Sequence, residues 1–455
     1  MRKYSYIITF FISVWMSSCA EEKNREQAVL EEQSQETISE DALLDTIQKQ
    51  TLKYFWDYAE PNSGMARERF HPDGEYPKDD AHVVTTGGSG FGLMAIVAGM
   101  EREFIPRDSA VARLDKIANF LENSTRFHGV WPHWINGETG QPQAFSAKDN
   151  GGDIVETSFL AQGFIVVREY LQEGTEEEQA VAQKYDELWK SIEWDWYTNN
   201  KNGIFWHWSP DYEWEMDFMI EGYNECLITY VLAASSPEYA IDAAAYHEGW
   251  ARGGNITTDE EAYGLPLILK HNTSGDKGGP LFWAHYSYLG LNPKGLIDRY
   301  ANYWDLNVNH SKINYNYCVE NPEGSETYSK ESWGLTASYT RTENDGIGYA
   351  AHSPDDDRGV VSPTAAVSSI PYTPIESLRA IRYFYEDQHE LLWGPAGFYD
   401  AFSLEGADWV APYYLAIDQG PQIVMIENYR SGLIWDLFMG APEVKEGLKK
   451  LDFSY

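Results

Sequence analysis

Apolar residues recur at roughly helical spacing in one segment after another of this 455-residue chain. The first segment starts near Ser39, a residue type that caps helices, and its apolar positions continue to Phe55. We predict further helices at residues 90–103, 109–123, 153–172, 175–194, 221–234, 238–252, 294–308, 374–386, 426–439 and 441–451.

Long connections rich in Gly, Pro, Trp and Asn separate these segments, for example at residues 127–152 and 201–217. A succession of helices without alternating strands argues against a doubly wound α/β sheet and against a TIM barrel. The length permits two domains, but no linker-like break follows Glu40. We therefore predict one all-α domain over residues 41–455, a helical toroid whose loops at one end build a functional cleft.

The first 40 residues have a different character. Basic residues at positions 2 and 3, an apolar stretch at 6–15 and Ser17-Ser18-Cys19 match a lipoprotein signal peptide over residues 1–19, with Cys19 as the acylated residue. Residues 20–40 are rich in Glu, Gln and Ser, as expected of an acidic flexible tether. We expect an exported protein, lipid-anchored in the periplasm-facing or cell-surface envelope of a Gram-negative-type bacterium. Met16 stands where Leu is usual, so plain secretion with a chance cysteine is the alternative.

Charge and aromatic content narrow the choice of ligand. With 71 acidic and 34 basic side chains the formal charge is −37, which argues against nucleic acid, and against a membrane partner other than through the anchor. The 17 Trp, 31 Tyr and 19 Phe residues exceed what a core usually needs. Aromatic faces stack on sugar rings while carboxylates and amides bind the hydroxyls, so the composition favours a carbohydrate ligand.

Metal and redox chemistry are not indicated. The sequence contains neither Cys-x-x-Cys nor His-Glu-x-x-His, and we expect no metal and no cofactor. Cys226 and Cys318 are the two cysteines after Cys19, and both lie among apolar or aromatic residues. Two buried free thiols are the commoner outcome in a large domain, although a disulfide is possible in an oxidising compartment.

The segment KDNGGDIVETSF carries the sharpest local feature, three acids within eight residues. If Asp153 opens a helix, Glu156 follows one turn later, and the Gly151-Gly152 bend can bring Asp149 close. Crowded carboxylates raise the pKa of at least one of their number, which keeps a carboxylic acid protonated near neutral pH. Spacing alone favours a simpler interpretation, a helix cap preceded by ordinary turn glycines.

A second acidic segment, DFMIEGYNECL, follows the aromatic loop at residues 204–208. Glu221 and Glu225 are four residues apart, so on the predicted helix they share a face and one is expected to be protonated. A solvated face is the alternative, but the helix continues with apolar residues on all sides, as a buried helix does. Two acidic clusters on one scaffold meet the needs of glycosidic cleavage, a general acid and a second carboxylate.

Other catalytic templates fit less well. No Gly-x-Ser-x-Gly elbow and no Walker loop occur, and residues 87–90 lack the strand and spacing of a dinucleotide fold. Histidines beside tryptophans are candidate sugar contacts, although each one alone is more often structural. The aromatic and histidine candidates for substrate binding are Trp131, His133, Trp134, Trp206 and Trp208.

Three long motifs resemble a known family. The sequences HWINGETGQPQAFSAKDNGGDIVETSFLAQG, DDDRGVVSPTAAVSSIPYTP and VAPYYLAIDQGPQIVMIENYRSGLIWDLFM are similar to the glucoamylase-like domain of glycoside hydrolase family 144 and of cyclic β-1,2-glucan synthases. The resemblance runs from about residue 40 to the end. It implies an (α/α)6 toroid, activity on linear β-1,2-glucan or its oligosaccharides, and inversion at the anomeric carbon.

The resemblance also implies roles for individual residues. The family's cleft acids match Asp149, Asp153, Glu156 and Glu225, with Glu225 as the favoured general acid. For the base we select Asp418, whose alternative is a loop carboxylate that orders the next helix; related enzymes reach their water through a substrate hydroxyl. Further substrate contacts are assigned to Glu221, Arg358, Tyr429 and Arg430, with structural ion pairs as the alternative for both arginines.

We therefore expect an endo-acting, inverting hydrolase of β-1,2-glucan. Exo-acting release of sophorose from the non-reducing end is the alternative within the family. Two other hypotheses remain open: a non-catalytic glycan-binding lipoprotein, and a phosphorylase, which needs a basic phosphate pocket that the sequence does not reveal.

Overall fold

The computed structural model describes residues 38–272 and 274–455. The predicted signal peptide, Cys19 and almost all of the predicted tether lie outside these residues. Helix α2 (Glu40–Trp56) starts as the sequence predicts, with the Ser39 hydroxyl accepting a hydrogen bond of 3.3 Å from the Ala42 amide. Residues 47–455 form one compact unit, and the fold and the site described below belong to it.

Helices of two kinds alternate along this unit. One kind is buried on nearly all sides, because its sequence is apolar or small throughout: α3 (Thr86–Glu101), α5 (Ile154–Leu171), α7 (Leu227–Ser235), α9 (Pro363–Ser368), α12 (Ala416–Arg430) and the short turns η4 (Leu281–Ala284) and η5 (Tyr286–Tyr288). These segments form the inner layer.

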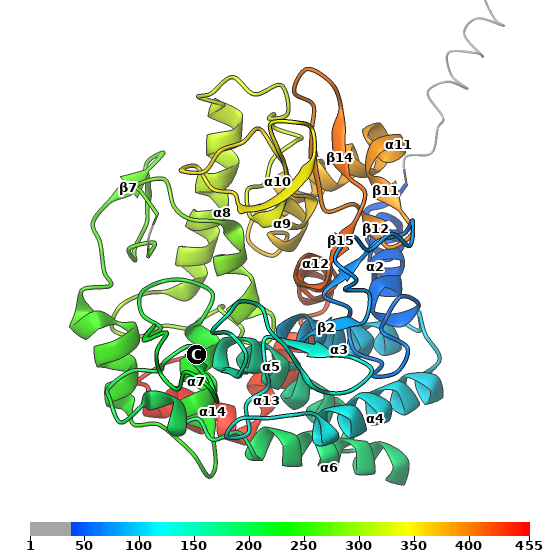
Figure 1. Cartoon of the computed structure of the whole chain (residues 1–455). Helices are drawn as coiled ribbons and strands as arrows, with labels where there is room; N and C mark the ends of the chain where they lie inside the picture. Colours follow the sequence, from blue (N-terminus) through cyan, green and yellow to red (C-terminus); the bar gives the residue numbers. More distant parts are fainter. Residues whose placement is uncertain (1–37, 273) are drawn as a thin grey trace, which may run out of the picture. The chain divides into compact units, whose positions relative to one another are not determined.

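The other kind buries a single stripe. In α4 (Arg107–Asn123) the buried positions are Ala110, Val111, Leu114, Ile117, Ala118 and Leu121, which lie on one face of a 3.6-residue helix. The same holds for α6 (Glu176–Lys190), the π-helical η2 (Ala245–Trp250), α8 (Tyr303–Glu320) and α10 (Pro374–Arg382). With the part of α2 in this unit they alternate with the inner segments, which confirms the predicted all-α (α/α)6 fold (Figure 1).

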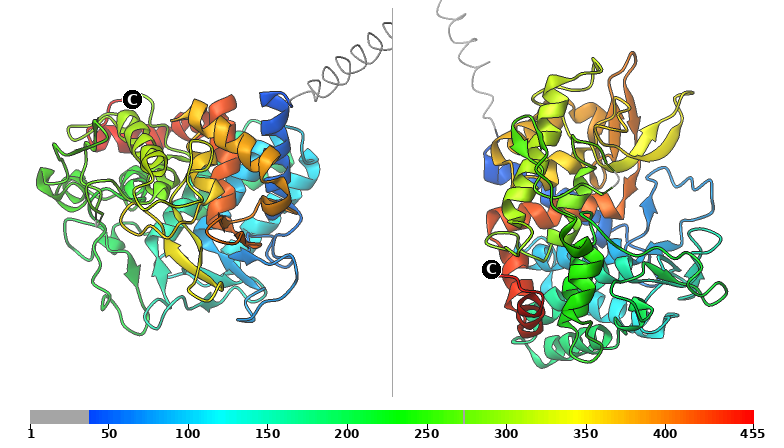
Figure 2. Two further views of the ribbon diagram at one scale, coloured as in Figure 1. Left: turned by 90° about the horizontal axis from the view of Figure 1, so that it is seen from above. Right: turned by 90° about the vertical axis from the view of Figure 1, so that its left-hand side faces the viewer.

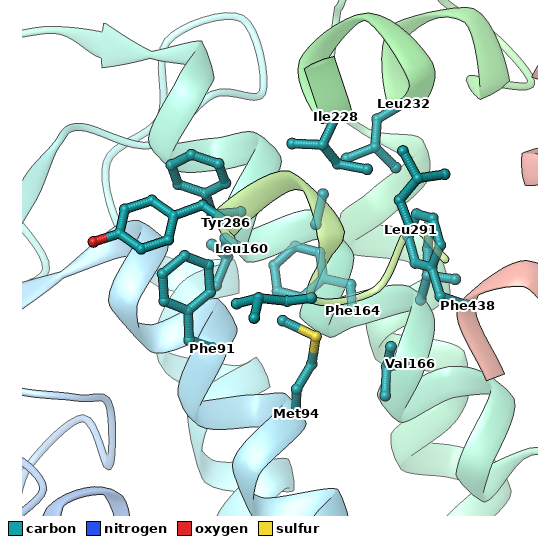
Figure 3. Packing of buried hydrophobic residues seen from close by; sticks show 14 of the residues in the cluster. Phe91, Met94, Leu160, Phe164, Val166, Ile228, Leu232, Tyr286, Leu291 and Phe438 are labelled. Carbon is teal, nitrogen blue, oxygen red and sulfur yellow. The ribbon is translucent and has the colours of Figure 1, made fainter. Parts of the chain in front are cut away.

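Small residues let the inner helices approach closely. A Cβ atom on Gly90 of α3 would lie 2.1 Å from the Phe159 carbonyl oxygen of α5, and one on Gly163 would lie 2.6 Å from the Gly90 carbonyl oxygen. Around this contact Phe91 of α3 and Phe164 of α5 pack into one apolar cluster (Figure 3). The glycine run at residues 87–90 therefore serves helix packing.

Some predicted boundaries are wrong for local reasons. The helix predicted at 294–308 starts only at Tyr303, because the Asn302 side chain caps it by accepting from the amides of residues 304 and 305. The helix predicted at 426–439 is two helices, α12 and α13 (Leu433–Gly440), separated by Gly432 at φ 77°. The last helix, α14 (Pro442–Lys450), lies where it is predicted, and the predictions omit α9. The remaining helices are short: η1 (Trp196–Thr198), η3 (Arg252–Gly254), η6 (Tyr383–Asp387) and α11 (His389–Leu392).

The connecting loops contain short strands, which pair with one another in antiparallel fashion. Three of them, β2 (Val83–Thr85), β5 (Gly152–Asp153) and β15 (Tyr414–Leu415), lead directly into inner helices and fix where those helices begin. Their partners are β3 (Trp134–Asn136), which also pairs β4 (Pro142–Gln143), then β6 (His207–Trp208) and β1 (Arg69–Phe70). The other pairs are β7 (Glu261–Ala262) with β8 (Leu265–Pro266), β9 (Ala337–Arg341) with β10 (Ile347–Ala351), β11 (Trp393–Gly394) with β12 (Gly397–Phe398), and β13 (Ala401–Ser403) with β14 (Trp409–Ala411). In Figure 2 the β9–β10 hairpin projects from the helices.

Over the described residues, no helix combines the length and the apolar character needed to cross a membrane. Cys226 and Cys318 are both buried free thiols, as the sequence favours.

Candidate active site

A cavity of about 1430 Å³ lies where the inner helices begin. Its wall includes Thr85 before α3, Glu156 in the first turn of α5, Cys226 before α7 and Ile417 in the first turn of α12. The volume exceeds that of a typical small-molecule pocket and suits an oligosaccharide. Aromatic side chains dominate the rest of the wall: Trp134, Phe145, Phe159, Trp206, Phe218, Phe282, Trp283, Tyr286, Tyr339, Tyr349 and Tyr413.

The three acids of the KDNGGDIVETSF segment gather around one histidine. Nδ1 of His133 lies 2.9 Å from Oδ2 of Asp153 and 3.7 Å from Oδ2 of Asp149, while its Nε2 lies 4.0 Å from Oε1 of Glu156. Strand β5 places Asp153 at the start of α5, and Gly151 lets the chain fold back, since a Cβ there would lie 2.0 Å from the Trp208 carbonyl oxygen. The convergence predicted from the sequence is therefore present, and His133 is its centre.

Asp153 combines two tasks. Its Oδ1 caps α5 by accepting from the amides of Val155 and Glu156 at 3.0 Å, so the helix-cap interpretation holds for this residue. Its Oδ2 accepts from the Trp206 indole at 2.8 Å, as well as from His133. Glu156, however, does not return to the helix start as a capping box requires. Its Oε2 accepts from the Gly87 amide of α3 at 2.8 Å, where a side chain on residue 87 would collide with it.

The carboxylates set the charge of His133. Burial lowers the pKa of this imidazole, but the carboxylates of Glu156, Asp153 and Asp149 outweigh burial and raise it to about 10. His133 is therefore an imidazolium at neutral pH. Burial raises the pKa of Glu156, and the neighbouring Asp153 adds to this effect while His133 opposes it.

His207 completes the cluster from the neighbouring strand. Its Nε2 lies 3.0 Å from Oδ1 of Asp149, and both side chains are fully buried. Sequence reasoning noted His207 only for its neighbour Trp208. Alternation along the extended segment 206–208, which directs Trp206 and Trp208 away from His207, is the signal that could have identified it.

One ligand atom each from His133, Asp149 and Asp153 lies within 4.8 Å of the others, close enough to hold a metal ion. The donor set fits a metal poorly at neutral pH, because the ion would have to displace the proton of His133, which the neighbouring carboxylates stabilise. We therefore expect that EDTA leaves kcat/KM unchanged, measured after dialysis against chelated buffer. Loss of activity that one added divalent metal restores would contradict this expectation.

Glu225 lines the same cavity, and the rest of its side chain is surrounded by protein. Its backbone carbonyl accepts from the Ser287 hydroxyl, and the following amide of Cys226 donates to Asn224 Oδ1 at 2.9 Å, which fixes the loop before α7. Burial raises the pKa of Glu225 to about 7, and the Asp153 carboxylate contributes in the same direction. Glu225 thus holds a proton near neutral pH.

The like-charge argument for Glu221 and Glu225 is wrong. Helix α7 begins at Leu227, so both acids lie in the preceding loop and share no helix face. Glu221 is 40% exposed, pairs with Arg252 at 3.2 Å between Oε1 and Nη2, and does not line the cavity. Burial, and not repulsion between these two residues, accounts for the raised pKa of Glu225.

Of the remaining predicted substrate contacts, His133, Trp134 and Trp206 line the cavity. Trp131 is fully buried and its indole donates to the Leu121 carbonyl, so it cannot stack on a sugar. Trp208 packs against Phe127, outside the cavity.

The other three predicted contacts also lie away from the cavity. Arg358 forms a two-point pair with Asp356 beside a separate acidic pocket. Tyr429 and Arg430 end α12, about 20 Å along the helix from its cavity end, and Arg430 donates to Gln48. For all of these residues the predicted cavity contact is corrected.

Asp418 lies beside the cavity lining without forming part of it. Burial, together with the Asp400 carboxyl to which Asp418 is hydrogen-bonded, raises its pKa well above the usual range. Because Asp418 does not line the cavity, this geometry does not favour it as the base that activates water there. Asp400, which the sequence did not single out, is fixed by the Tyr339 amide at 2.7 Å.

Sequence reasoning also missed an ionic group in the cavity wall, formed by Glu68, Arg69 and Asp80. Glu68 and Arg69 are in contact, and Arg69 lies 3.4 Å from Asp80. Burial raises the pKa of Glu68, and its neighbour Asp80 adds to this while Arg69 opposes it. Because two acids surround Arg69, it does not create a site for phosphate.

Comparison with known proteins agrees with these features. A family model described as "Putative glucoamylase" matches residues 217–442. Among curated proteins, the chain is 42% identical over 432 residues to an exo β-1,2-glucooligosaccharide sophorohydrolase (non-reducing end) of Parabacteroides distasonis. The match covers 91% of this chain and 58% of that protein, so this chain spans little more than half of its length.

Two solved structures are similar over nearly the whole of this chain. An endo-β-1,2-glucanase from Chitinophaga pinensis, in complex with sophorotriose and glucose, is 55% identical, with a TM-score of 0.89 and coverage of 92% of this chain and 99% of that chain. A β-1,2-glucanase from Parabacteroides distasonis is 41% identical, with a TM-score of 0.84 and coverage of 91% and 60% respectively.

Proposed function

The chain belongs to the glucoamylase-like family of glycoside hydrolases, family 144, and we propose that it hydrolyses internal β-1,2-glucosidic bonds of linear β-1,2-glucan. The observation that carries the proposal is Glu225, a carboxyl with a raised pKa in the wall of a large aromatic cavity. The relative named as an endo-β-1,2-glucanase, which matches this chain over nearly the full length of both, supports internal cleavage.

In the proposed reaction Glu225 protonates the glycosidic oxygen as the bond breaks. The cluster of Asp149, Asp153 and Glu156 acts on the attacking water: it orients the water, or the substrate hydroxyl through which water is reached, and takes up the proton that the water loses on attack. His133 keeps this cluster ordered and offsets part of its negative charge. Attack on the face opposite the leaving group gives inversion.

The deciding experiment is incubation of the purified protein with linear β-1,2-glucan and chromatography of the products over time. A ladder of oligosaccharides at early times is the expected result. Sophorose alone from the outset would establish exo action, which the sophorohydrolase relative makes the second candidate. Release of no sugar from any β-glucan would overturn hydrolysis in favour of glycan binding, and a requirement for phosphate would indicate a phosphorylase.

The raised pKa of Glu225 predicts the alkaline limb of the pH profile. The acid must be protonated to act, and burial places its pKa at about 7. We expect kcat/KM to be insensitive to this group below that pH and to fall about tenfold per pH unit well above it. Initial rates on a short oligosaccharide between pH 5 and 9 test this, with thermal stability recorded at each pH. A profile that stays flat to pH 9 would contradict Glu225 as the acid.

We also propose that the protein is exported and anchored by a lipid on Cys19. The support is the sequence of residues 1–19. Expression of the full chain in a Gram-negative host with a labelled fatty acid should label the wild type and not the Cys19→Ala variant. Equal labelling, or none in either, would contradict the anchor.

A further inference from the structure

One tryptophan differs from all others in the described chain. Trp196, in η1, is 40% exposed, whereas every other described tryptophan is half-buried or fully buried. A single exposed indole needs no explanation, but one that joins other aromatic side chains in an exposed patch marks a binding surface. Trp196 does not line the cavity.

Trp196 forms an aromatic platform together with Trp208 and Trp214. His128 stacks on it with ring centroids 3.6 Å apart and planes 13° apart, so the exposed surface of the indole is mainly its other face and its edge. Trp214 lies beside it at 6.4 Å and 35°, and Trp208 meets it edge-on at 6.4 Å. Both neighbours are half-buried.

Hydrogen bonds hold the parts of the platform in place. Nδ1 of His128 lies 2.9 Å from Oε2 of Glu193, which fixes the ring beneath Trp196. The loop that carries Trp214 is closed by paired backbone hydrogen bonds between Ser209 and Glu213 at 2.9 and 2.8 Å. Preorganised aromatic surfaces bind at a low entropic cost.

The platform is continuous with the cavity wall. Trp208 follows the cavity residue Trp206 by two positions on the same extended segment, a rise of about 7 Å. The loop of Trp214 continues to Phe218, which lines the cavity and is 54% exposed. A chain that leaves the cavity beside Trp206 and Phe218 would reach the platform next.

Charge selects the occupant. The exposed acids Asp195, Asp211 and Glu213 lie on the segments of the platform, and Glu193 is half-exposed beside His128. They disfavour an anionic ligand, and the chain's formal charge of −37 disfavours a second copy of itself. A neutral polyol fits, because its ring faces stack on indoles and its hydroxyls donate to carboxylates.

We propose that Trp196, Trp208 and Trp214 form a second glucan-binding site, which holds the part of a β-glucan chain that extends beyond the cavity. This inference rests on the proposed function for the identity of the glucan. The site makes no contact with the reacting bond, so it acts on long substrates only.

The test compares long linear β-1,2-glucan with a short oligosaccharide that fits within the cavity, for wild type, Trp196→Ala and Trp196→Ala/Trp214→Ala. We expect KM for the long glucan to rise about threefold to tenfold, with kcat and the short-substrate KM unchanged. Trp393→Ala is the matched control, because this half-buried tryptophan also stacks on a histidine, His389, at 5.8 Å, away from the cavity. An unchanged KM for long glucan, an equal rise for both substrates, or the same rise in the control would overturn the site.

Native electrophoresis in gels that contain β-1,2-, β-1,3- or β-1,4-glucan separates this inference from the proposed function. Retardation of wild type that the Trp196→Ala variant loses supports the platform, even if no glucan is cleaved. Retardation by none of the glucans, or equal retardation of both proteins, would overturn it. Binding of a peptide partner instead would appear as capture that added glucan does not compete away, which also contradicts the proposal.

Discussion

Replacing Glu225 with Gln should lower kcat on linear β-1,2-glucan by about 10³-fold, because the departing sugar oxygen then receives no proton. Glutamine keeps the shape of the side chain and cannot ionise. Since burial disfavours the ionised form of Glu225, the variant should be at least as stable as wild type above pH 7. Initial rates and thermal unfolding at pH 8 measure both effects.

Glu221→Gln is the matched control, since it makes the same chemical change four residues earlier on the same loop. Glu221 pairs with Arg252 outside the cavity, so kcat should stay within about twofold of wild type. A substrate with an aryl leaving group, which departs without a proton, should recover much of the activity of the Glu225→Gln variant. If Glu225→Gln retains wild-type kcat, or if the aryl substrate is as impaired as glucan, the acid is another residue.

The fold was predictable because its inner and outer helices differ in composition. Inner helices such as α5 are apolar on all sides, and outer ones such as α4 carry an apolar stripe, so both patterns are visible in the sequence. Predicted helix boundaries were wrong where a single residue sets the boundary. Asn302 caps α8 after eight residues that read as helical, and Gly432 interrupts a run that is apolar on both sides.

The site was predictable in part, for a related reason. Asp149, Asp153 and Glu156 are close in sequence, so local geometry was enough to bring them together. Partners that are distant in sequence were not: Gly87 reaches the site on helix α3, and Glu68 reaches it from the loop before strand β1. Aromatic residues near the acids were overassigned, because sequence alone cannot tell a buried indole such as Trp131 from one that faces the cavity.

Asp153 shows how closely structure and chemistry are joined at this site. One carboxylate oxygen accepts from two amides at the start of α5, and the other accepts from Trp206 and His133. The carbonyl oxygen of asparagine can still accept from the two amides of α5. Its amide nitrogen, which is a donor, then faces the N–H groups of Trp206 and His133. We expect Asp153→Asn to lose about 1–3 kcal/mol of unfolding free energy and to lower kcat by about 10²-fold or more.

A control at a helix cap outside the active site separates the loss of stability from the loss of kcat. Thr175 caps α6, and its hydroxyl accepts from the Glu178 amide at 3.3 Å, far in sequence from the acids. Thr175→Ala should cost about 1 kcal/mol of stability and leave kcat unchanged once rates are divided by the folded fraction. Asp153→Asn should remain impaired after the same correction, because the imidazolium of His133 loses its closest carboxylate and no longer holds Glu156 and Asp149 in place. If the corrected kcat of Asp153→Asn returns to the wild-type value, Asp153 serves only as a helix cap and the catalytic cluster must be assigned without it.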